Sequence, residues 1–206
     1  MRILAIDCAT EACSAALFDG GALVDGRFEL LHRGHAERLV PMIAELPDKG
    51  RADRILVSLG PGSFTGVRIG LAAARALGLA WGAEVFGYPT MALVAAMAQE
   101  EHPDRPLTVC TTGGHGEWFV QEFGAVGLPL AEVISQTPEA AKRSLRNSIV
   151  AGSRAGDLLA NSGAEAIALD ILPDARCAHL LPPALLTPAL SPIYGRPPDA
   201  RLPGAV

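Results

Sequence analysis

Residues 2–30 carry the strongest structural signal in the chain, and they read RILAIDCATEACSAALFDGGALVDGRFEL. The apolar run over 2–7 ends in an aspartate, as a buried strand does, and residues 12–18 form a second such run. Asp19-Gly20-Gly21 indicates a hairpin, because these residues accept the positive φ of a tight turn. Apolar and charged residues alternate over 22–30, which is typical of a half-exposed strand. We therefore expect three consecutive strands joined by hairpin turns.

Helix and strand patterns alternate after this hairpin. Leu39, Met42, Ile43 and Leu46 recur at helical spacing. Pro41 lies inside that pattern and is expected to kink the helix or delay its regular part, because proline cannot donate to the preceding turn. The expected elements are a helix over about 35–46, a strand over 54–59, a helix over about 64–80, a strand over 84–88 and a helix over 90–99. The resulting order is βββαβαβα.

A charged stretch with two prolines, EEHPDRP at 100–106, divides the chain. We expect a first domain over 1–101, a second over 102–190 and an extended tail over 191–206. The elements expected in the second domain are strands over 107–112 and 117–123 around a Gly113-Gly114 turn, a helix near 138–146, a strand over 148–151 and a helix over 153–162. The last 34 residues hold eight of the 16 prolines, which excludes a long helix or central strand there. Within the tail, Ser191 to Arg196 are candidates for pairing at a sheet edge.

Two α/β units that each open in a hairpin resemble the duplicated architecture of the actin, sugar-kinase and Hsp70 superfamily. That resemblance implies an α/β, actin-like (ASKHA, ribonuclease H-like) fold of two βββαβα-type subdomains, with the second degenerate. Other α/β folds share the pattern of elements.

The composition narrows the function classes. The 206 residues are 50% hydrophobic and carry a net charge of −5, which argues against disorder and against autonomous nucleic-acid binding. Five histidines and two lysines make a thin catalytic inventory. Asp7 and Glu11 interrupt the apolar N-terminus, which therefore does not resemble a signal peptide. Arg68 and Arg75 break the best candidate for a membrane span, so we expect a cytoplasmic protein without a membrane partner.

Metal, thiol and nucleophile patterns are weak throughout. The four cysteines, Cys8, Cys13, Cys110 and Cys177, have no Cys-x-x-Cys spacing, so we expect buried reduced thiols and neither a zinc site nor a redox pair. The motif His32-x-x-His35-x-Glu37 fits no known metal spacing, and its residues are suited to opening a helix. Ser14 and Ser63 lack a Gly-x-Ser-x-Gly elbow. We expect no catalytic residues and no metal site in this chain.

The loop Gly60-Pro61-Gly62-Ser63-Phe64-Thr65-Gly66 stands between a strand and a helix, where phosphate-binding loops occur. It is not a Walker loop, because Val67 and not lysine follows its last glycine. Two interpretations stay open: an anion-binding loop, or a tight turn with Ser63 or Thr65 as the helix N-cap. Asp7 likewise is either a phosphate-site acid or a cap of the hairpin turn. The candidates for nucleotide binding are Asp7, Gly60, Gly62 and Ser63.

Small residues line one side of the following helix. Gly66, Gly70 and Ala74 lie at i, i+4 and i+8, and such spacing lets another backbone approach closely. A glycine inside a helix costs about 1 kcal/mol relative to alanine, so Gly70 suggests a packing reason. Ala73 and Leu77 continue this face, and Arg68 and Arg75 could flank it. The stripe packs either on the protein's own sheet or against a partner chain.

Four segments together resemble the bacterial TsaB (YeaZ) family. They are Ile6-Asp7-Cys8-Ala9-Thr10 with 13–17, Arg33-Gly34-His35-Ala36-Glu37-Arg38 running on to Ile43, the run from Gly60 to Gly70, and Pro192-Ile193-Tyr194-Gly195-Arg196 running on to Arg201. The resemblance is dense over 1–95 and returns at the C-terminus.

This resemblance implies a role in making threonylcarbamoyladenosine beside the tRNA anticodon. The family looks like a non-catalytic platform that pairs with its catalytic paralogue TsaD and with the ATPase TsaE. It implies ATP and metal in those partners and none in this chain, tRNA contact only through the complex, and a homodimer when alone. Pairing is expected through the helices near 35–46 and 64–80. The expected partner contacts are Glu37, Leu39, Met42, Ile43, Gly66, Arg68, Ile69, Gly70, Ala73, Ala74, Arg75 and Leu77.

The departures from the family and its paralogue matter. The catalytic paralogue carries His-x-x-x-His after its fifth strand, whereas this chain has GYPTMALV over 87–94. Cys8 stands where the family usually has threonine, Thr112-Gly113-Gly114 replaces a common Asp-Ala-Arg, and the connection over 47–51 looks short. The rival hypotheses are an ASKHA-type ATP-binding phosphotransferase or ATPase that uses Asp7 and the Gly60 loop, and an M22-like peptidase, for which no nucleophile or metal site is found.

Overall fold

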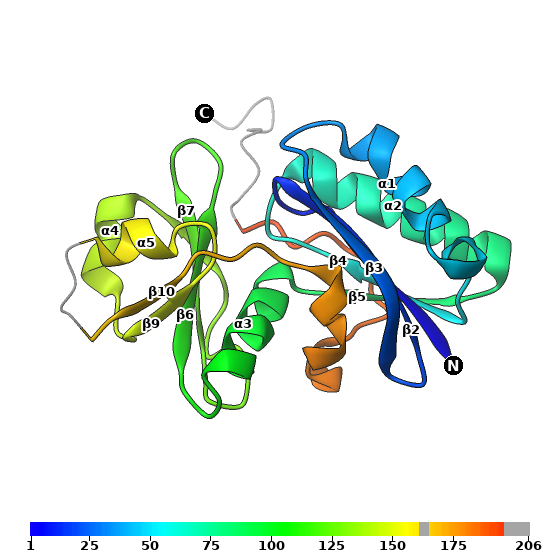
Figure 1. Cartoon of the computed structure of the whole chain (residues 1–206). Helices are drawn as coiled ribbons and strands as arrows, with labels where there is room; N and C mark the ends of the chain where they lie inside the picture. Colours follow the sequence, from blue (N-terminus) through cyan, green and yellow to red (C-terminus); the bar gives the residue numbers. More distant parts are fainter. Residues whose placement is uncertain (161–164, 196–206) are drawn as a thin grey trace.

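The computed structural model describes residues 1–160 and 165–195, which form two α/β units side by side (Figure 1). The first sheet has the strand order β3-β2-β1-β4-β5. Its strands are β1 (Arg2–Asp7), β2 (Ala12–Asp19), β3 (Ala22–Leu30), β4 (Arg54–Ser58) and β5 (Glu84–Tyr88). The predicted double hairpin is confirmed, and β4 and β5 run parallel to β1 because helices connect them.

Two helices cover the outer face of this sheet: α1 (His35–Ala44) and α2 (Phe64–Trp81). Pro41 remains inside α1 without delaying it, and its carbonyl accepts a hydrogen bond from the Glu45 N–H (3.1 Å). The missing proline donor is tolerated because this stretch of α1 is exposed, so water can satisfy the freed carbonyl. A short 3₁₀ helix, η1 (Pro47–Gly50), follows. Gly82 then ends α2 in the left-handed conformation (φ 68°) that glycine favours.

The second unit repeats the first with shorter elements, as expected for a degenerate copy. Its elements are β6 (Leu107–Thr112), β7 (Trp118–Phe123), β8 (Ile134–Gln136), α4 (Pro138–Ser144), β9 (Ile149–Ala151), α5 (Ala155–Leu159) and β10 (Ile167–Leu169). The order β8-β7-β6-β9-β10 is equivalent to β3-β2-β1-β4-β5. The three-residue strands β8 and β10 were not predicted, because so short a run carries no period. The helices predicted over 138–146 and 153–162 are shorter in the structure.

Hydrophobic residues form three layers. One core joins the inner faces of the two sheets around α3 (Thr90–Glu101) and the 3₁₀ helix η2 (Ala175–Leu180), and it includes Tyr88 and Phe119. A second lies between the first sheet and α1–α2, and a third lies under α4–α5. The shared inner core places the ends of β1 and β6 at one opening between the units.

The chain finally returns from the second unit to the first. After η3 (Pro183–Leu185), residues 186–195 run extended, as expected from their prolines, and we call them the C-terminal strap. Thr187 forms a bridge with Gly87, and the Ile193 N–H donates to the Leu59 carbonyl (2.8 Å). The rest of the predicted tail, from Arg196 to 206, lies outside the described residues. Over the ranges 1–160 and 165–195, no helix has the length and apolar character needed to cross a bilayer.

Candidate functional site

Asp7 ends β1 with its carboxylate turned into the protein. Only 1% of the residue is exposed, and the carboxylate accepts hydrogen bonds from the Ala9 N–H (2.9 Å) and the Tyr88 hydroxyl (3.1 Å). Burial raises the pKa of Asp7 to about 7, since desolvation disfavours the charged form. Of the two interpretations left open, the structure shows the turn cap. Its placement does not support the prediction that Asp7 meets a nucleotide.

The glycine loop is wedged against the hairpin turn. Ser63 caps α2, with its Oγ accepting from the Gly66 N–H (3.2 Å), and its own N–H donates to the Ala9 carbonyl (2.6 Å). A Cβ at Gly62 would collide with the Ala9 carbonyl, and one at Gly66 would collide with that of Cys8. Close backbone approach therefore requires these glycines, and the N-cap interpretation is correct for Ser63.

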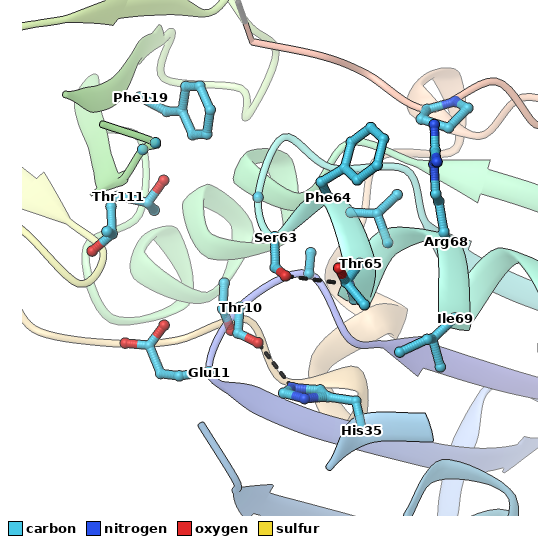
Figure 2. Close-up of a pocket in the computed structure, with 18 of the residues that line it drawn as sticks. Thr10, Glu11, His35, Ser63, Phe64, Thr65, Arg68, Ile69, Thr111 and Phe119 are labelled. Atoms are coloured by element: carbon cyan, nitrogen blue, oxygen red, sulfur yellow. Dashed lines mark hydrogen bonds between the residues drawn. The ribbon is translucent and has the colours of Figure 1, made fainter. Parts of the chain in front are cut away.

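A cleft of about 1170 Å³ opens between the two units (Figure 2). Its walls come from the β1–β2 turn, the β3–α1 connection with the first turn of α1, the start of α2, the β6–β7 turn and the C-terminal strap. Of the four predicted nucleotide residues, Gly62 and Ser63 lie in this wall, whereas Asp7 and Gly60 are not among the described lining residues. Gly60 instead lies under the strap, where a Cβ would come within 3.0 Å of the Ile193 carbonyl oxygen.

Two of the basic side chains around the cleft, His35 and Arg68, are engaged with the protein itself. His35 Nε2 lies 2.9 Å from the Thr10 carbonyl oxygen and 3.2 Å from that of Ala12. The Arg68 guanidinium stacks on the Phe64 ring at 3.5 Å and donates to the Tyr194 hydroxyl (3.3 Å). No group of three His, Cys, Asp or Glu side chains within the described ranges could hold a metal ion.

The 12 residues predicted to contact a partner fall into two groups, one buried and one accessible to solvent. Six of them are buried in the core of the first unit, and they are Leu39, Met42, Ile43, Gly66, Gly70 and Ala74. A Cβ at Gly70 would contact Val57 (3.5 Å) and Cys8 (3.8 Å), so the small-residue stripe faces this chain's own sheet. The internal-packing alternative is therefore correct for the stripe. The partner surface predicted from these six residues must be corrected, because residues buried in this chain's own core are not accessible to another chain.

The remaining six predicted contacts are accessible to different degrees. Ile69, Ala73 and Leu77 are half-buried, whereas Glu37, Arg68 and Arg75 are exposed. The two arginines hold the strap, since Arg75 donates to the Leu190 carbonyl (2.7 Å) just as Arg68 reaches Tyr194.

Uncharged residues nevertheless dominate the solvent side of α1 and α2. We call this set the outer helix face, and it consists of Ala36, Val40, Pro41, Ala44, Ile69, Ala72, Ala73, Ala76, Leu77, Leu79 and Ala80. Val40 is 55% exposed and Leu79 is 89% exposed. Most of these residues were not predicted from the sequence, because the recognisable helical spacing is that of the buried side chains. The sequence does contain a sign of this face: the apolar residue Val40 directly follows buried Leu39 and therefore points to another side of the helix.

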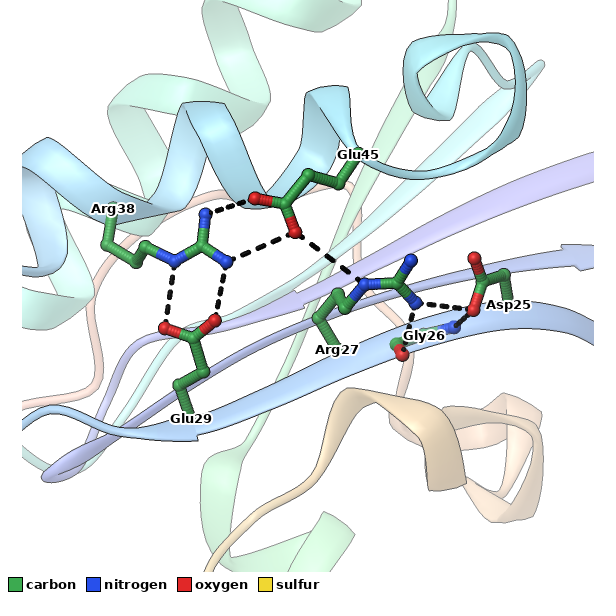
Figure 3. Close-up of polar contacts among 6 residues, drawn as sticks. All are labelled: Asp25, Gly26, Arg27, Glu29, Arg38 and Glu45. Atoms are coloured by element: carbon green, nitrogen blue, oxygen red, sulfur yellow. Dashed lines mark hydrogen bonds and ion pairs between the residues drawn. The ribbon is translucent and has the colours of Figure 1, made fainter.

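An ion-pair network fixes the position of α1 on the edge strand β3 (Figure 3). Arg38 donates to both carboxylate oxygens of Glu29 (2.8 and 2.5 Å) and also pairs with Glu45 (2.7 Å). Arg27 links Glu45 to Asp25. The guanidinium of Arg38 lowers the pKa of Glu29 and that of Glu45. The helix α1, which carries part of the outer helix face, is thereby anchored at both ends, by His35 and by Glu45.

Comparisons by sequence find similarity to proteins named for threonylcarbamoyl modification of tRNA. Residues 29–173 match the family described as TsaD, tRNA N6-adenosine threonylcarbamoyltransferase. The tRNA threonylcarbamoyladenosine biosynthesis protein TsaB of Escherichia coli K12 is 40% identical over 130 residues, which are 60% of this chain and 55% of that protein. A tRNA N6-adenosine threonylcarbamoyltransferase of Corynebacterium diphtheriae is 31% identical over 118 residues, covering 55% of this chain and 33% of that protein.

The solved structure of YeaZ from Pseudomonas aeruginosa matches both units of this chain. It superposes with a TM-score of 0.77 at 25% identity, over 94% of this chain and 99% of that one. This match and the two equivalent sheets confirm the predicted α/β, actin-like fold class. By sequence, the matched region spans just over half the length of the E. coli protein.

Proposed function

Because the chain belongs to the tRNA N6-adenosine threonylcarbamoyltransferase (TsaD) family, in its TsaB (YeaZ) group, we propose that it serves threonylcarbamoyladenosine synthesis as a non-catalytic subunit. In this proposal it pairs in the cytoplasm with a TsaD-like catalytic paralogue, and a TsaE-like ATPase joins them. ATP and metal are bound by those partners, and tRNA meets this chain only within the complex. The isolated chain forms a homodimer.

The observation that carries the proposal is the outer helix face. Exposed apolar side chains gathered on one side of a molecule mark candidate sites of association. Here two packed helices together expose Val40 and Leu79 among alanines. Small side chains allow a second pair of helices to approach closely, as a helical bundle requires.

The inner side of the first unit supports a non-catalytic role. Asp7, the acid that the rival hypothesis of an ATP-binding enzyme requires, is buried in the core. The stretch in which the catalytic paralogue has its histidines is here the start of α3, and Thr90, Met91 and Val94 are buried between the sheets. An ATP-binding phosphotransferase is therefore disfavoured, although the cleft has room for a ligand.

Pairing can be tested by co-elution of the full chain with the TsaD-like paralogue of the same organism, with and without ATP, TsaE and tRNA. Leu79→Lys places a charge on the outer helix face and should weaken pairing at least about tenfold. Lysine is compatible with the last turn of α2, because the helix dipole favours positive charge there, so folding should be unaffected.

Val126→Lys is the matched control, since Val126 is 75% exposed but lies in the second unit. It should pair normally. If the unmodified chain never co-elutes under any of these conditions, the scaffold role is wrong. If both variants pair equally well, the partner site lies elsewhere.

A further inference from the structure

Two buried thiols meet at the turn end of the β1–β2 hairpin. Cys8 follows β1 and Cys13 lies in β2, and their Sγ atoms are 3.5 Å apart. The register pairs Asp7 with Ser14, so the next opposed pair in the hairpin is Cys8 and Cys13. Opposed residues of antiparallel strands have Cα atoms about 4.5–5.5 Å apart, which lies within the range that a disulfide spans. The sequence spacing gave no hint of this pairing, because it depends on the register.

The turn between these cysteines supports the first residues of both outer helices. The Ala9 carbonyl accepts from the Ser63 N–H at the start of α2. The carbonyls of Thr10 and Ala12 bond to His35 at the start of α1. These bonds connect the turn directly to the starting points of α1 and α2.

The pair lies behind the turn, close to the cleft in sequence. Ala9, Thr10 and Glu11 of the turn line the cleft, whereas Cys8 and Cys13 are only 1% and 0% exposed, so a small oxidant in the cleft must pass the turn to reach them. The hydrogen bond from the Cys8 thiol lowers the pKa of Cys13, which favours Cys13 as the thiolate that reacts first.

We propose that Cys8 and Cys13 are a reversible dithiol–disulfide pair, oxidised by hydrogen peroxide. The Cys13 sulfur attacks one peroxide oxygen, the O–O bond breaks, and the leaving hydroxide takes up the proton that the Cys13 thiol gave up, so that water departs as Cys13 becomes a sulfenic acid. The Cys8 sulfur then attacks the Cys13 sulfur, the S–O bond breaks, and the oxygen departs as a second water with the proton of the Cys8 thiol. The two sulfurs together lose two electrons to the peroxide, and a dithiol reductant reverses the change.

Oxidation shortens the sulfur–sulfur separation from 3.5 Å to about 2.05 Å and cross-links the turn. We expect slower amide exchange at the starts of α1 and α2, by about tenfold. The link from there to partner binding rests on the proposed function, but formation of the disulfide does not.

The experiment treats the folded full-length chain with hydrogen peroxide, removes the peroxide, unfolds the chain in denaturant with an alkylating agent that blocks every remaining thiol, and digests it with trypsin. A Cys177→Ser background removes the most accessible competing thiol. Both cysteines lie in one peptide, Ile3 to Arg27. This peptide should lose two hydrogen atoms and resist alkylation until dithiothreitol is added. Hydrogen exchange of the same oxidised sample reports on α1 and α2.

Cys13→Ser is the matched control and should give no such species. The proposal is overturned if peroxide leaves both thiols open to alkylation. It is also overturned if Cys13 gains oxygen without linking to Cys8, or if either cysteine links to Cys110. A disulfide that leaves exchange at both helix starts unchanged would overturn the coupling to α1 and α2.

Discussion

At the scale of single residues, the buried acid Asp7 makes the clearest prediction. Its pKa is about 7 in the folded protein, against 3.8 when unfolded, because burial disfavours the carboxylate. Between these values the folded state binds the extra proton, so stability from this group is fully present below pH 3.8 and is lost as pH rises through 7.

Asp7→Asn should therefore remove this pH-dependent loss of stability. Relative to the unmodified chain, the free energy of unfolding of the variant should rise by up to about 4 kcal/mol between pH 4 and pH 7.5, as denaturant unfolding can measure. Glu132→Gln, at an exposed acid of the second unit, is the control and should leave the pH profile unchanged. A parallel profile for Asp7→Asn and the unmodified chain would contradict an elevated pKa.

At the scale of elements, two glycines of α2 should respond in opposite directions to the same substitution. A Cβ at Gly70 finds ordinary contacts of 3.5 Å or more, so Gly70→Ala should raise the free energy of unfolding by up to about 1 kcal/mol. Gly66→Ala should lower it, because its Cβ would collide with the Cys8 carbonyl. Thermal unfolding of both variants checks this, and equal shifts would show that the stripe is not packed as described.

The contact between α1 and β3 should depend on salt. Arg38→Met removes the charges that pair with Glu29 and Glu45 but keeps an apolar stem of similar length. The melting temperature should drop at low ionic strength, and the drop should shrink in 1 M salt, where pairs are screened beyond about 3 Å. A drop independent of salt would mean that packing, not charge, holds α1 at this edge.

Most elements of the fold were predictable, and the failures have a common cause. Strands such as β1 and β4 are recognisable because their burial produces long apolar runs. The strands β8 and β10 have three residues each and take their place from neighbouring strands, which local sequence does not encode.

In the candidate site, too, the features set by local sequence were predicted and those set by long-range contacts were not. Local chemistry predicted the Ser63 cap, but the direction in which the Gly66–Gly70 stripe faces depends on where the sheet lies. The contact between Cys8 and Cys13 depends on strand register, and the engagement of Arg68 and Arg75 depends on the returning strap. These are all long-range contacts, and one sequence read alone does not specify them.

At the scale of the whole molecule, the outer helix face should serve only one partner at a time. We expect the isolated chain to form a two-fold dimer through this face, because a symmetric dimer uses the same patch twice. The TsaD-like paralogue is proposed to use the same surface. Adding it should therefore convert homodimer into heterodimer in proportion to its concentration, as sedimentation equilibrium can measure. Leu79→Lys should be defective in both pairings, and Val126→Lys in neither. A heterotetramer that retains an intact homodimer would show that two separate surfaces exist.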